Sequence, residues 1–206
     1  MSRSEMLGNF RDLGLGFKDP ALSAQAAFRA ALRAFAAPAL PVEMDFASLF
    51  QAPPPLPAEM AALALVLADG EASVYLSPSL KDAGTYLSFH GGVAKVAPEE
   101  AFFVFAAAEA EAPPLALLRQ GSEKAPDESA TLILGGALTG KEGGVKYWAS
   151  GPGIKEPRLW APRGLSASFL AERGEIVAAY PLGIDIFLTG PNLLMGLPRT
   201  TLLERA

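Results

Sequence analysis

At 206 residues, half of them apolar, the chain is long enough to bury a substantial core as one domain or, less readily, two small ones. Its net charge of −5 gives no electrostatic reason to expect nucleic acid or an anionic membrane as a ligand. Cysteine is absent and His90 is the only histidine, which excludes disulfides, thiolate metal sites, iron–sulfur clusters and His–Cys pairs within the chain.

The distribution of apolar residues shows no export or membrane signal. No run near the N-terminus has the length of a signal peptide, and the most apolar windows, 61–68 and 101–108, are far shorter than the ~20 residues that span a bilayer. We therefore expect a soluble cytoplasmic protein. Residues 1–18 have weak periodicity, which predicts a flexible N-terminal arm before a single domain over 19–206.

The first predicted element is a helix that begins at Asp19-Pro20, where an N-cap residue precedes a proline at the first helical position. It ends before Pro38. Residues 37–57 are rich in proline and predict an irregular loop that crosses one edge of the fold. The segment 59–67 is apolar nearly all round, which indicates a buried helix.

Two faces of the first helix can be distinguished by residue type. Phe28, Leu32 and Phe35 recur at helical spacing, and we expect them to form its buried stripe. Arg29 and Arg33 lie four residues apart on another face. These two arginines form either a solvated basic edge or a contact for an acidic partner.

The middle of the chain alternates short apolar runs with helical patterns. The predicted strands are 73–77, 101–106, 130–134 and 145–150, and the predicted helices are 78–89, 114–118 and 166–173. Because a glycine-rich connection joins the last two strands, we expect them to pair as a hairpin.

The C-terminal stretch 180–201 predicts a second, more apolar hairpin. Its two strands, 184–188 and 193–197, are joined by Gly190-Pro191-Asn192. A hairpin this apolar has to lie inside a larger sheet. Helices and strands alternate early and strands pair locally later, so the sequence predicts one three-layer α/β domain with a mixed sheet covered by helices.

One segment, GGALTGKEGG at 135–144, has the glycine and lysine spacing of a phosphate-binding P-loop and follows a predicted strand. That motif needs a Ser or Thr after the lysine and a helix after the loop. Here Glu142 follows Lys141, and the next element is a predicted strand. A hairpin loop is therefore a better interpretation than a nucleotide site.

Four side chains are candidates for anion or interface contacts: His90, Asp185, Arg199 and Thr200. Asp185 is a carboxylate in an apolar strand, and folding the hairpin brings it close to Arg199, so we expect a structural ion pair. Alternatively, Arg199 and Thr200 belong to a small oxyanion-binding cluster. His90 lies at a predicted helix end, either as a hydrogen-bonded structural residue or in a cleft, where it contacts an anion or a partner subunit. No nucleophile has a visible base, so we expect no catalytic residue, metal or cofactor.

Beyond these local patterns, the chain resembles a known family over residues 20–204. The segments that carry the resemblance are PLGIDIFLTG (181–190), LLMGLPRTT (193–201), AFRAALRAFAAPA (27–39), LSFHGG (87–92), ATLIL (130–134) and GPGI (151–154). They are similar in sequence and order to motifs of the PhnH family, the H subunit of the bacterial carbon–phosphorus lyase core complex.

The resemblance implies a fold related to PLP-dependent transferases but without PLP or its catalytic apparatus. It also implies a non-catalytic subunit that works with the G, I and J components. That complex, with an L component, makes ribose 1-phosphonate 5-triphosphate from ATP and an alkylphosphonate by displacing adenine, and the J component later cleaves the carbon–phosphorus bond. In isolation we expect such a subunit to form a homodimer, because its partner-binding surface is otherwise exposed.

Two other functions stay open at this point. One is a small-molecule binding protein that takes a phosphonate or a nucleotide at its own anion site, through His90, Arg199 and Thr200. The other is a stand-alone PLP enzyme with a Schiff-base lysine. Lys141 and Lys146 are poor candidates for that lysine, because they flank the predicted hairpin connection.

Overall fold

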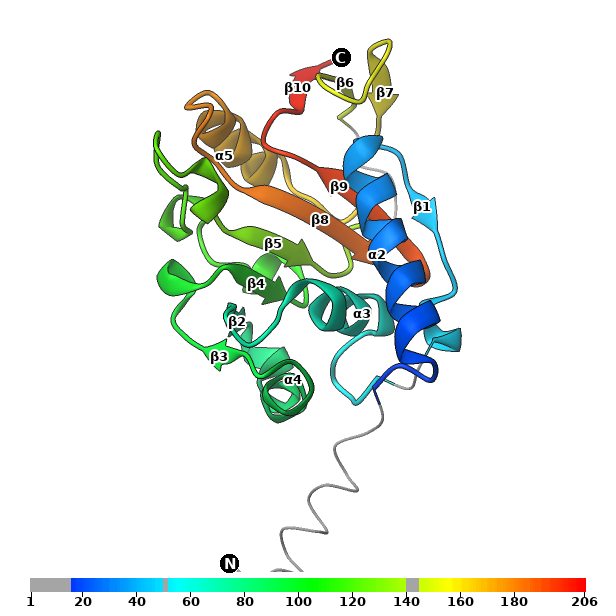
Figure 1. The fold of residues 1–206 in the computed structure, drawn as a ribbon. Coiled ribbons are helices and arrows are strands. Elements are labelled where there is room, and N and C mark those ends of the chain that lie inside the picture. Colours follow the sequence, from blue (N-terminus) through cyan, green and yellow to red (C-terminus); the bar gives the residue numbers. More distant parts are fainter. Residues whose placement is uncertain (1–15, 50–51, 140–144) are drawn as a thin grey trace, which may run out of the picture.

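The computed structural model of the chain describes residues 16–49, 52–139 and 145–206 (Figure 1). Its α-helices are α2 (Pro20–Ala36), α3 (Ala58–Leu67), α4 (Gly84–Gly91) and α5 (Ala167–Val177). Its strands are β1 (Val42–Glu43), β2 (Ser73–Leu76), β3 (Ala94–Lys95), β4 (Phe103–Ala106), β5 (Thr131–Leu134), β6 (Tyr147–Ser150), β7 (Arg158–Trp160), β8 (Asp185–Gly190), β9 (Leu193–Leu197) and β10 (Leu202–Arg205). Short 3₁₀ helices lie at 46–48, 78–83, 98–100, 109–111, 115–117 and 126–128.

The described strands form a seven-stranded sheet in the order β1-β9-β8-β5-β4-β2-β3 and a separate three-stranded sheet. In the large sheet, neighbours from β3 to β8 are parallel, whereas β9 runs antiparallel to β8 and to β1. The central parallel strands are apolar on both faces, and in β5 Leu132, Ile133 and Leu134 are all fully buried. The predicted mixed α/β sheet is therefore confirmed.

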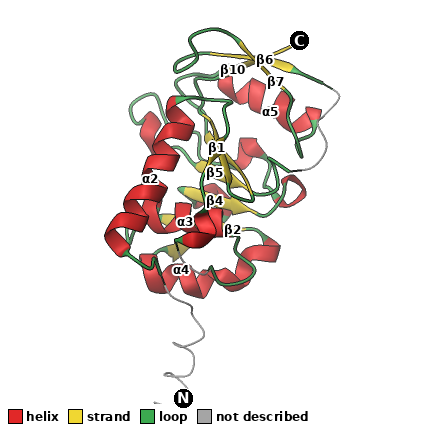
Figure 2. Ribbon diagram, turned by 90° about the vertical axis from the view of Figure 1, so that its right-hand side faces the viewer, coloured by secondary structure: helices red, strands yellow, loops and turns green. Residues whose placement is uncertain are grey.

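Helices cover both faces of the large sheet, as the view along its edge shows (Figure 2). On one face α2, α3 and α4 pack over a core that includes Phe105, Ile133 and Phe187. On the other face α5 and the small sheet pack over a second core that includes Leu132 and Leu188. Because successive side chains of a strand point to opposite faces, each central strand contributes to both cores.

The C-terminal hairpin is present as predicted, whereas the predicted pairing of 130–134 with 145–150 is wrong. β8 and β9 pair antiparallel, from Ile186 opposite Leu197 to Gly190 opposite Leu193. β5 instead lies between β4 and β8, so both of its edges are occupied. β6 pairs with β7 and β10 in the small sheet. Of the P-loop-like segment, residues 140–144 lie outside the described residues.

The sequence interpretation of the faces of α2 is also wrong. The helix buries mostly small residues: Ser23, Ala27, Ala30, Ala31 and Ala34. Phe28 and Leu32 are instead 44% and 54% exposed, and only Phe35 turns inward, where its ring stacks on Phe187 at 4.1 Å between centroids. The reason is the close approach of α2 to β9, where a Cβ on Gly196 would lie 2.5 Å from the Ala34 carbonyl oxygen. Little more than alanine fits in that space.

The start of α2 agrees with the prediction. The Asp19 carboxylate accepts hydrogen bonds from the backbone N–H groups of Ala21 and Leu22 at 3.1 and 3.0 Å. We expect Asp19→Ala to lower the free energy of unfolding by about 1 kcal/mol, because both N–H groups lose their acceptor. Urea denaturation measures this change. Asp19→Asn, which can still cap the helix, should cost much less, and equal losses for the two variants would contradict the capping role.

Several short elements were missed by the sequence patterns, namely β1, β3, β7 and β10. β1 lies within the loop 37–57 and forms one edge of the large sheet, so the prediction that this loop crosses an edge is confirmed. Within the predicted arm, the Lys18 backbone N–H donates to the Leu49 carbonyl at 2.9 Å, while residues 1–15 lie outside the described residues. The division into an arm, 1–18, and a domain, 19–206, stays a prediction.

Candidate functional site

The predicted ion pair between Asp185 and Arg199 is present. The register of the hairpin places Ile186 opposite Leu197, so Asp185 at the start of β8 lies beside the residues that follow β9. Arg199 Nη2 donates to Asp185 Oδ2 at 2.6 Å, and the Arg199 backbone N–H donates to Oδ1 at 2.8 Å. Both side chains are largely buried, with 13% of Arg199 and 23% of Asp185 exposed, which makes each charge dependent on the other.

The remaining donors of Arg199 bind other segments of the chain. Nη1 donates to the carbonyls of Pro126 at 2.7 Å and Pro181 at 3.5 Å, and Nη2 also donates to the Ser129 hydroxyl. Nε contacts Asp185 Oδ1 at 3.4 Å. A guanidinium has five N–H donors, and each one here has an acceptor within the chain. Arg199 therefore clamps three segments together, and an external anion would have to displace one of these bonds.

A second arginine, Arg173 on α5, lies beneath this cluster and is only 2% exposed. Its Nη2 donates to the carbonyls of Pro198 and Thr201 at 2.8 and 3.0 Å. Burial lowers the pKa of Arg173 to about 10, and the nearby Asp185 carboxylate opposes that shift. Asp185 is therefore the counter-charge for two arginines.

Arg173 was not singled out from the sequence, although a signal for it exists. It follows Phe169 and Leu170 and precedes Val177 at helical spacing, on the stripe of α5 that is buried. A charge on such a stripe needs internal partners. Arg173 Nε and the Thr201 hydroxyl are buried without a hydrogen-bond partner among the described residues. The hydrogen bonds around Arg173 are therefore incomplete within the described part of the chain.

A cavity of about 520 Å³ opens beside Arg199. It is lined by Pro126, Asp127, Ser129, Thr131, Tyr180, Pro181, Asp185, Arg199 and Thr200. A second hollow of about 360 Å³ shares Tyr180, Arg199 and Thr200 and has a more apolar wall that includes Leu202. The structure thus brings three of the predicted site residues together around one depression, in which Tyr180 is 64% exposed. This surface offers hydrogen-bonding groups and an aromatic ring for contact with another molecule.

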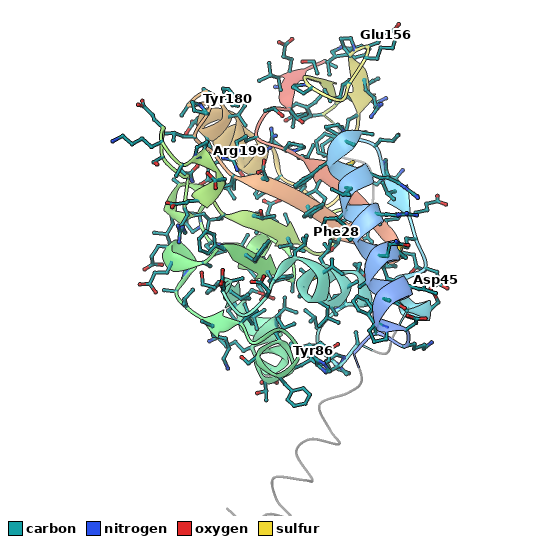
Figure 3. The ribbon with its side chains drawn as sticks, in the orientation of Figure 1. Phe28, Asp45, Tyr86, Glu156, Tyr180 and Arg199 are labelled. Carbon is teal, nitrogen blue, oxygen red and sulfur yellow. The ribbon has the colours of Figure 1, made fainter. Side chains whose placement is uncertain are left out.

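His90, the fourth predicted site residue, is not part of this depression. It lies near the end of α4, whose C-cap residue, Gly92, has the left-handed conformation with φ 69°, so the predicted helix end is confirmed. Its ring packs against those of Tyr86 and Phe89, with centroids 4.5 and 5.0 Å apart. Tyr86 lies near the lower end of the molecule in Figure 3, whereas Arg199 lies in its upper half, far from Tyr86. A joint anion site of His90 with Arg199 is therefore excluded by geometry, and a separate anion or interface role for His90 stays a prediction.

The described residues contain neither a candidate metal site nor a candidate membrane-spanning helix. Within the ranges 16–49, 52–139 and 145–206, no group of three or more His, Asp or Glu side chains is placed to hold a metal ion. Among the helices of those ranges, none has the length and apolarity of a membrane span.

Glu59, in the first turn of α3, is a buried carboxylate whose pKa is raised, chiefly by desolvation. Because burial disfavours its charged form, Glu59→Gln should raise the free energy of unfolding at neutral pH. The gain should shrink as the pH falls through the raised pKa and disappear below about pH 4, where unfolded Glu is also protonated. Urea denaturation at a series of pH values measures it, and a gain independent of pH would contradict the assigned cause.

Comparison with known proteins places these features in a family. Residues 15–204 match the family described as bacterial phosphonate metabolism protein (PhnH). The chain belongs to the PhnH family. All four predicted site residues and the buried Arg173 fall within the matched range, so the resemblance predicted from the motifs is confirmed.

Two relatives of this PhnH-family chain have informative names. It is 36% identical over 193 residues to the alpha-D-ribose 1-methylphosphonate 5-triphosphate synthase subunit PhnH of Rhizobium meliloti (strain 1021), which covers 92% of this chain and 94% of the relative. It is 32% identical over 112 residues to the putative C-P lyase subunit protein HtxG of Stutzerimonas stutzeri, which covers 53% of this chain and 54% of that relative. Both relatives are named as subunits.

Proposed function

We propose that this chain is a non-catalytic subunit of the bacterial carbon–phosphorus lyase complex, needed to make ribose 1-phosphonate 5-triphosphate from ATP and an alkylphosphonate. The observation that carries the proposal is its 36% identity to a synthase subunit over nearly the whole of both chains. Its partners are the other core subunits, the G, I and J components, and it acts in the cytoplasm.

The Arg199 cluster supports a role in structure rather than in chemistry. A catalytic group has to contact a reacting atom, whereas every N–H of the Arg199 guanidinium is held by Asp185, Ser129, Pro126 or Pro181. The cluster fixes the end of the β8–β9 hairpin against neighbouring loops. It thereby shapes a surface that another protein can bind.

Exposed apolar side chains on α2 support docking and self-association. Leu22, Phe28 and Leu32 are exposed on this helix, and Arg29 and Arg33 are exposed beside them (Figure 3 shows Phe28). Surfaces of this kind are typical of protein interfaces. We expect the isolated chain to form a homodimer. Light scattering at micromolar concentration tests this expectation, and a strict monomer would contradict this part of the proposal.

Co-purification tests the subunit assignment. The chain with an affinity tag is co-expressed with the other core subunits of the same bacterium, and the purified material is analysed by mass. We expect one assembly that contains the G, I and J components in fixed ratio. Recovery of the tagged chain alone, although the other subunits are soluble in the same extract, would contradict the assignment.

The depression beside Arg199 is the specific feature that favours the rival function, a small-molecule site. Calorimetry of the isolated chain with ATP and with methylphosphonate separates the two functions. We expect no binding of either. Tight binding that Arg199→Ala abolishes, in a variant shown to be folded, would favour the rival.

We also propose that the fold is related to that of PLP-dependent transferases and that it no longer binds PLP. The alternation of helices and parallel strands in the large sheet is compatible with this relation. Incubation with PLP should leave the protein colourless after dialysis. A retained yellow colour, removed by substitution of one lysine, would instead support a PLP enzyme.

A further inference from the structure

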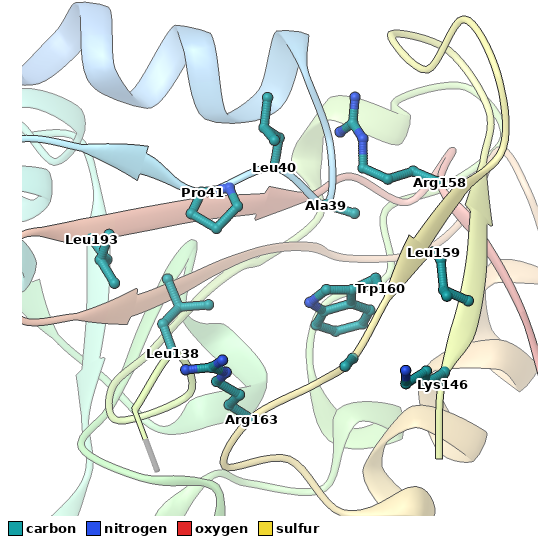
Figure 4. A pocket seen from close by; sticks show the side chains of 11 residues that line it. Ala39, Leu40, Pro41, Leu138, Lys146, Arg158, Leu159, Trp160, Arg163 and Leu193 are labelled. Carbon is teal, nitrogen blue, oxygen red and sulfur yellow. The ribbon is translucent and has the colours of Figure 1, made fainter. Parts of the chain in front are cut away.

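A groove of about 460 Å³ lies between the two sheets (Figure 4), and it shares no lining residue with the two hollows beside Arg199. One wall is formed by Arg158, Leu159, Trp160 and Ala161, and the opposite wall by Ala39, Leu40 and Pro41, just before β1. Leu138, Lys146, Arg163 and Leu193 complete the lining. Trp160 stands at the centre of the view, with its ring facing the groove (Figure 4).

The composition of the first wall shows how the groove lies relative to β7. Successive side chains of a strand point to opposite faces, so a hollow on one face touches only alternate residues. This groove touches every residue of β7, Arg158–Trp160, and Ala161 after it. The groove therefore runs along the edge of β7.

Within the described part of the chain, the edge of β7 that faces away from β6 pairs with no strand. In the three-stranded sheet, with the order β10-β6-β7, β6 is the only described strand that pairs with β7. An unpaired strand edge presents a row of backbone N–H and C=O groups that can bind an extended peptide. At one end the two walls are tied together, because Arg158 Nη1 donates to the Pro38 carbonyl at 2.7 Å.

The side chains around this edge combine positive charge with apolar surface. Among the described residues that line the groove are three cations, Lys146, Arg158 and Arg163, and no carboxylate, although the whole chain carries a net charge of −5. Leu159 is 46% exposed, and Trp148, opposite it in the register of β6 and β7, is 44% exposed. Tryptophan, arginine and exposed leucine next to an open strand edge are typical of a protein-binding surface.

We propose that this groove binds an extended segment of another subunit, rich in acidic and apolar residues, which adds as a strand to the free edge of β7. The partner class rests on the proposed function. Backbone hydrogen bonds to β7 hold the segment. Its apolar side chains pack against Trp160 on one face of β7 and Leu159 on the other, and its carboxylates face Lys146 and Arg163.

Two other occupants fit the groove less well. A small anion needs desolvated, converging donors, but Lys146 and Arg163 are exposed and Arg158 already donates to Pro38. A second copy of this chain, paired edge to edge through β7, would bring the same three cations of both copies together, which is repulsive. An acidic segment of a different subunit avoids both problems.

Charge reversal in the assembled complex tests the charge part of the proposal. The double variant Lys146→Glu with Arg163→Glu should lower the affinity of the chain for the other co-expressed subunits by at least about tenfold. The control is Lys81→Glu with Lys124→Glu, which makes the same change in net charge at two exposed lysines outside the groove. This control should leave the affinity unchanged. Urea denaturation confirms that both variants are folded.

Hydrogen exchange tests the strand addition separately. In the wild-type complex, the β7 amides that do not bond to β6 should exchange at least about tenfold more slowly than in the free chain. The outer amides of β10, the other edge of the same sheet, should change little. Unchanged exchange of β7 in an intact complex would overturn strand addition.

The outcomes separate this inference from the proposed function. If the wild-type chain fails to assemble with the other subunits, the proposed function is wrong. If it assembles and the groove variant assembles equally well, the docking site is wrong while the function stands. Binding of inorganic pyrophosphate by the isolated chain, lost in the groove variant, would make the groove an anion site and overturn the inference. So would a change of oligomeric state of the isolated groove variant with assembly intact.

Discussion

Replacing Asp185 with Asn is expected to lower the free energy of unfolding by about 3 kcal/mol. The substitution keeps the shape of the side chain and removes its charge. Arg199 then loses the partner of its 2.6 Å ion pair, and the buried Arg173 loses the negative charge of Asp185, which favours its protonated form. Because removing one partner of a buried pair leaves an uncompensated charge, the loss is larger than that of a surface ion pair. Urea denaturation monitored by tryptophan fluorescence measures it.

The matched control is Asp127→Asn. Asp127 lines the same cavity as Asp185 but is exposed, and its carboxylate forms no hydrogen bond or ion pair with the residues that the structure describes. Its substitution should change the free energy of unfolding by less than about 0.5 kcal/mol. Equal effects at the two positions would contradict the account of Arg199 as a structural clamp and would restore the predicted oxyanion site as the better interpretation.

Gly196→Ala is expected to destabilise the protein by about 3 kcal/mol, at the upper end for an added methyl group. A Cβ at this position would lie 2.5 Å from the carbonyl oxygen of Ala34 and 2.7 Å from its carbonyl carbon, both backbone atoms of α2. The helix cannot move away without loosening the stack of Phe35 on Phe187. The same denaturation experiment measures the loss.

Gly174→Ala is the control with the opposite sign. Gly174 lies exposed within α5, and a Cβ there would have no atom within 4 Å. Alanine is favoured over glycine inside a helix, so this variant should gain about 0.5–1 kcal/mol. If Gly196→Ala were as well tolerated, the close approach of α2 to β9 would be wrong, and with it the explanation of why α2 exposes Phe28 and Leu32.

Much of the fold was predictable because its signals are local. The cap at Asp19-Pro20, the apolar helix around 59–67 and the two runs of the C-terminal hairpin each specify an element from adjacent residues. The orientation of α2 was not predictable in this way. Hydrophobicity alone predicts that Phe28 and Leu32 are buried. The alanines are buried instead, because only small residues fit against Gly196 in β9, which is distant in the sequence.

The site was predictable only in part for similar reasons. The pairing of Asp185 with Arg199 follows from the turn between two strands, which the sequence shows. The acceptors at Pro126 and Ser129 are about seventy residues away along the chain and have no periodic pattern. The edge of β7 was not predictable, because the three residues Arg158–Trp160 are too short a run to indicate a strand. In addition, β6 belongs to the three-stranded sheet and does not pair with β5 as the sequence predicts.

Adenine release tests the central claim most directly. ATP and methylphosphonate are incubated with the purified chain alone, with the remaining subunits of the complex alone, and with both together. The account predicts that adenine is released only when the chain and the remaining subunits are both present. Phosphonate-dependent adenine release by the chain alone, or full activity without it, would contradict a non-catalytic subunit that acts through the proteins it binds.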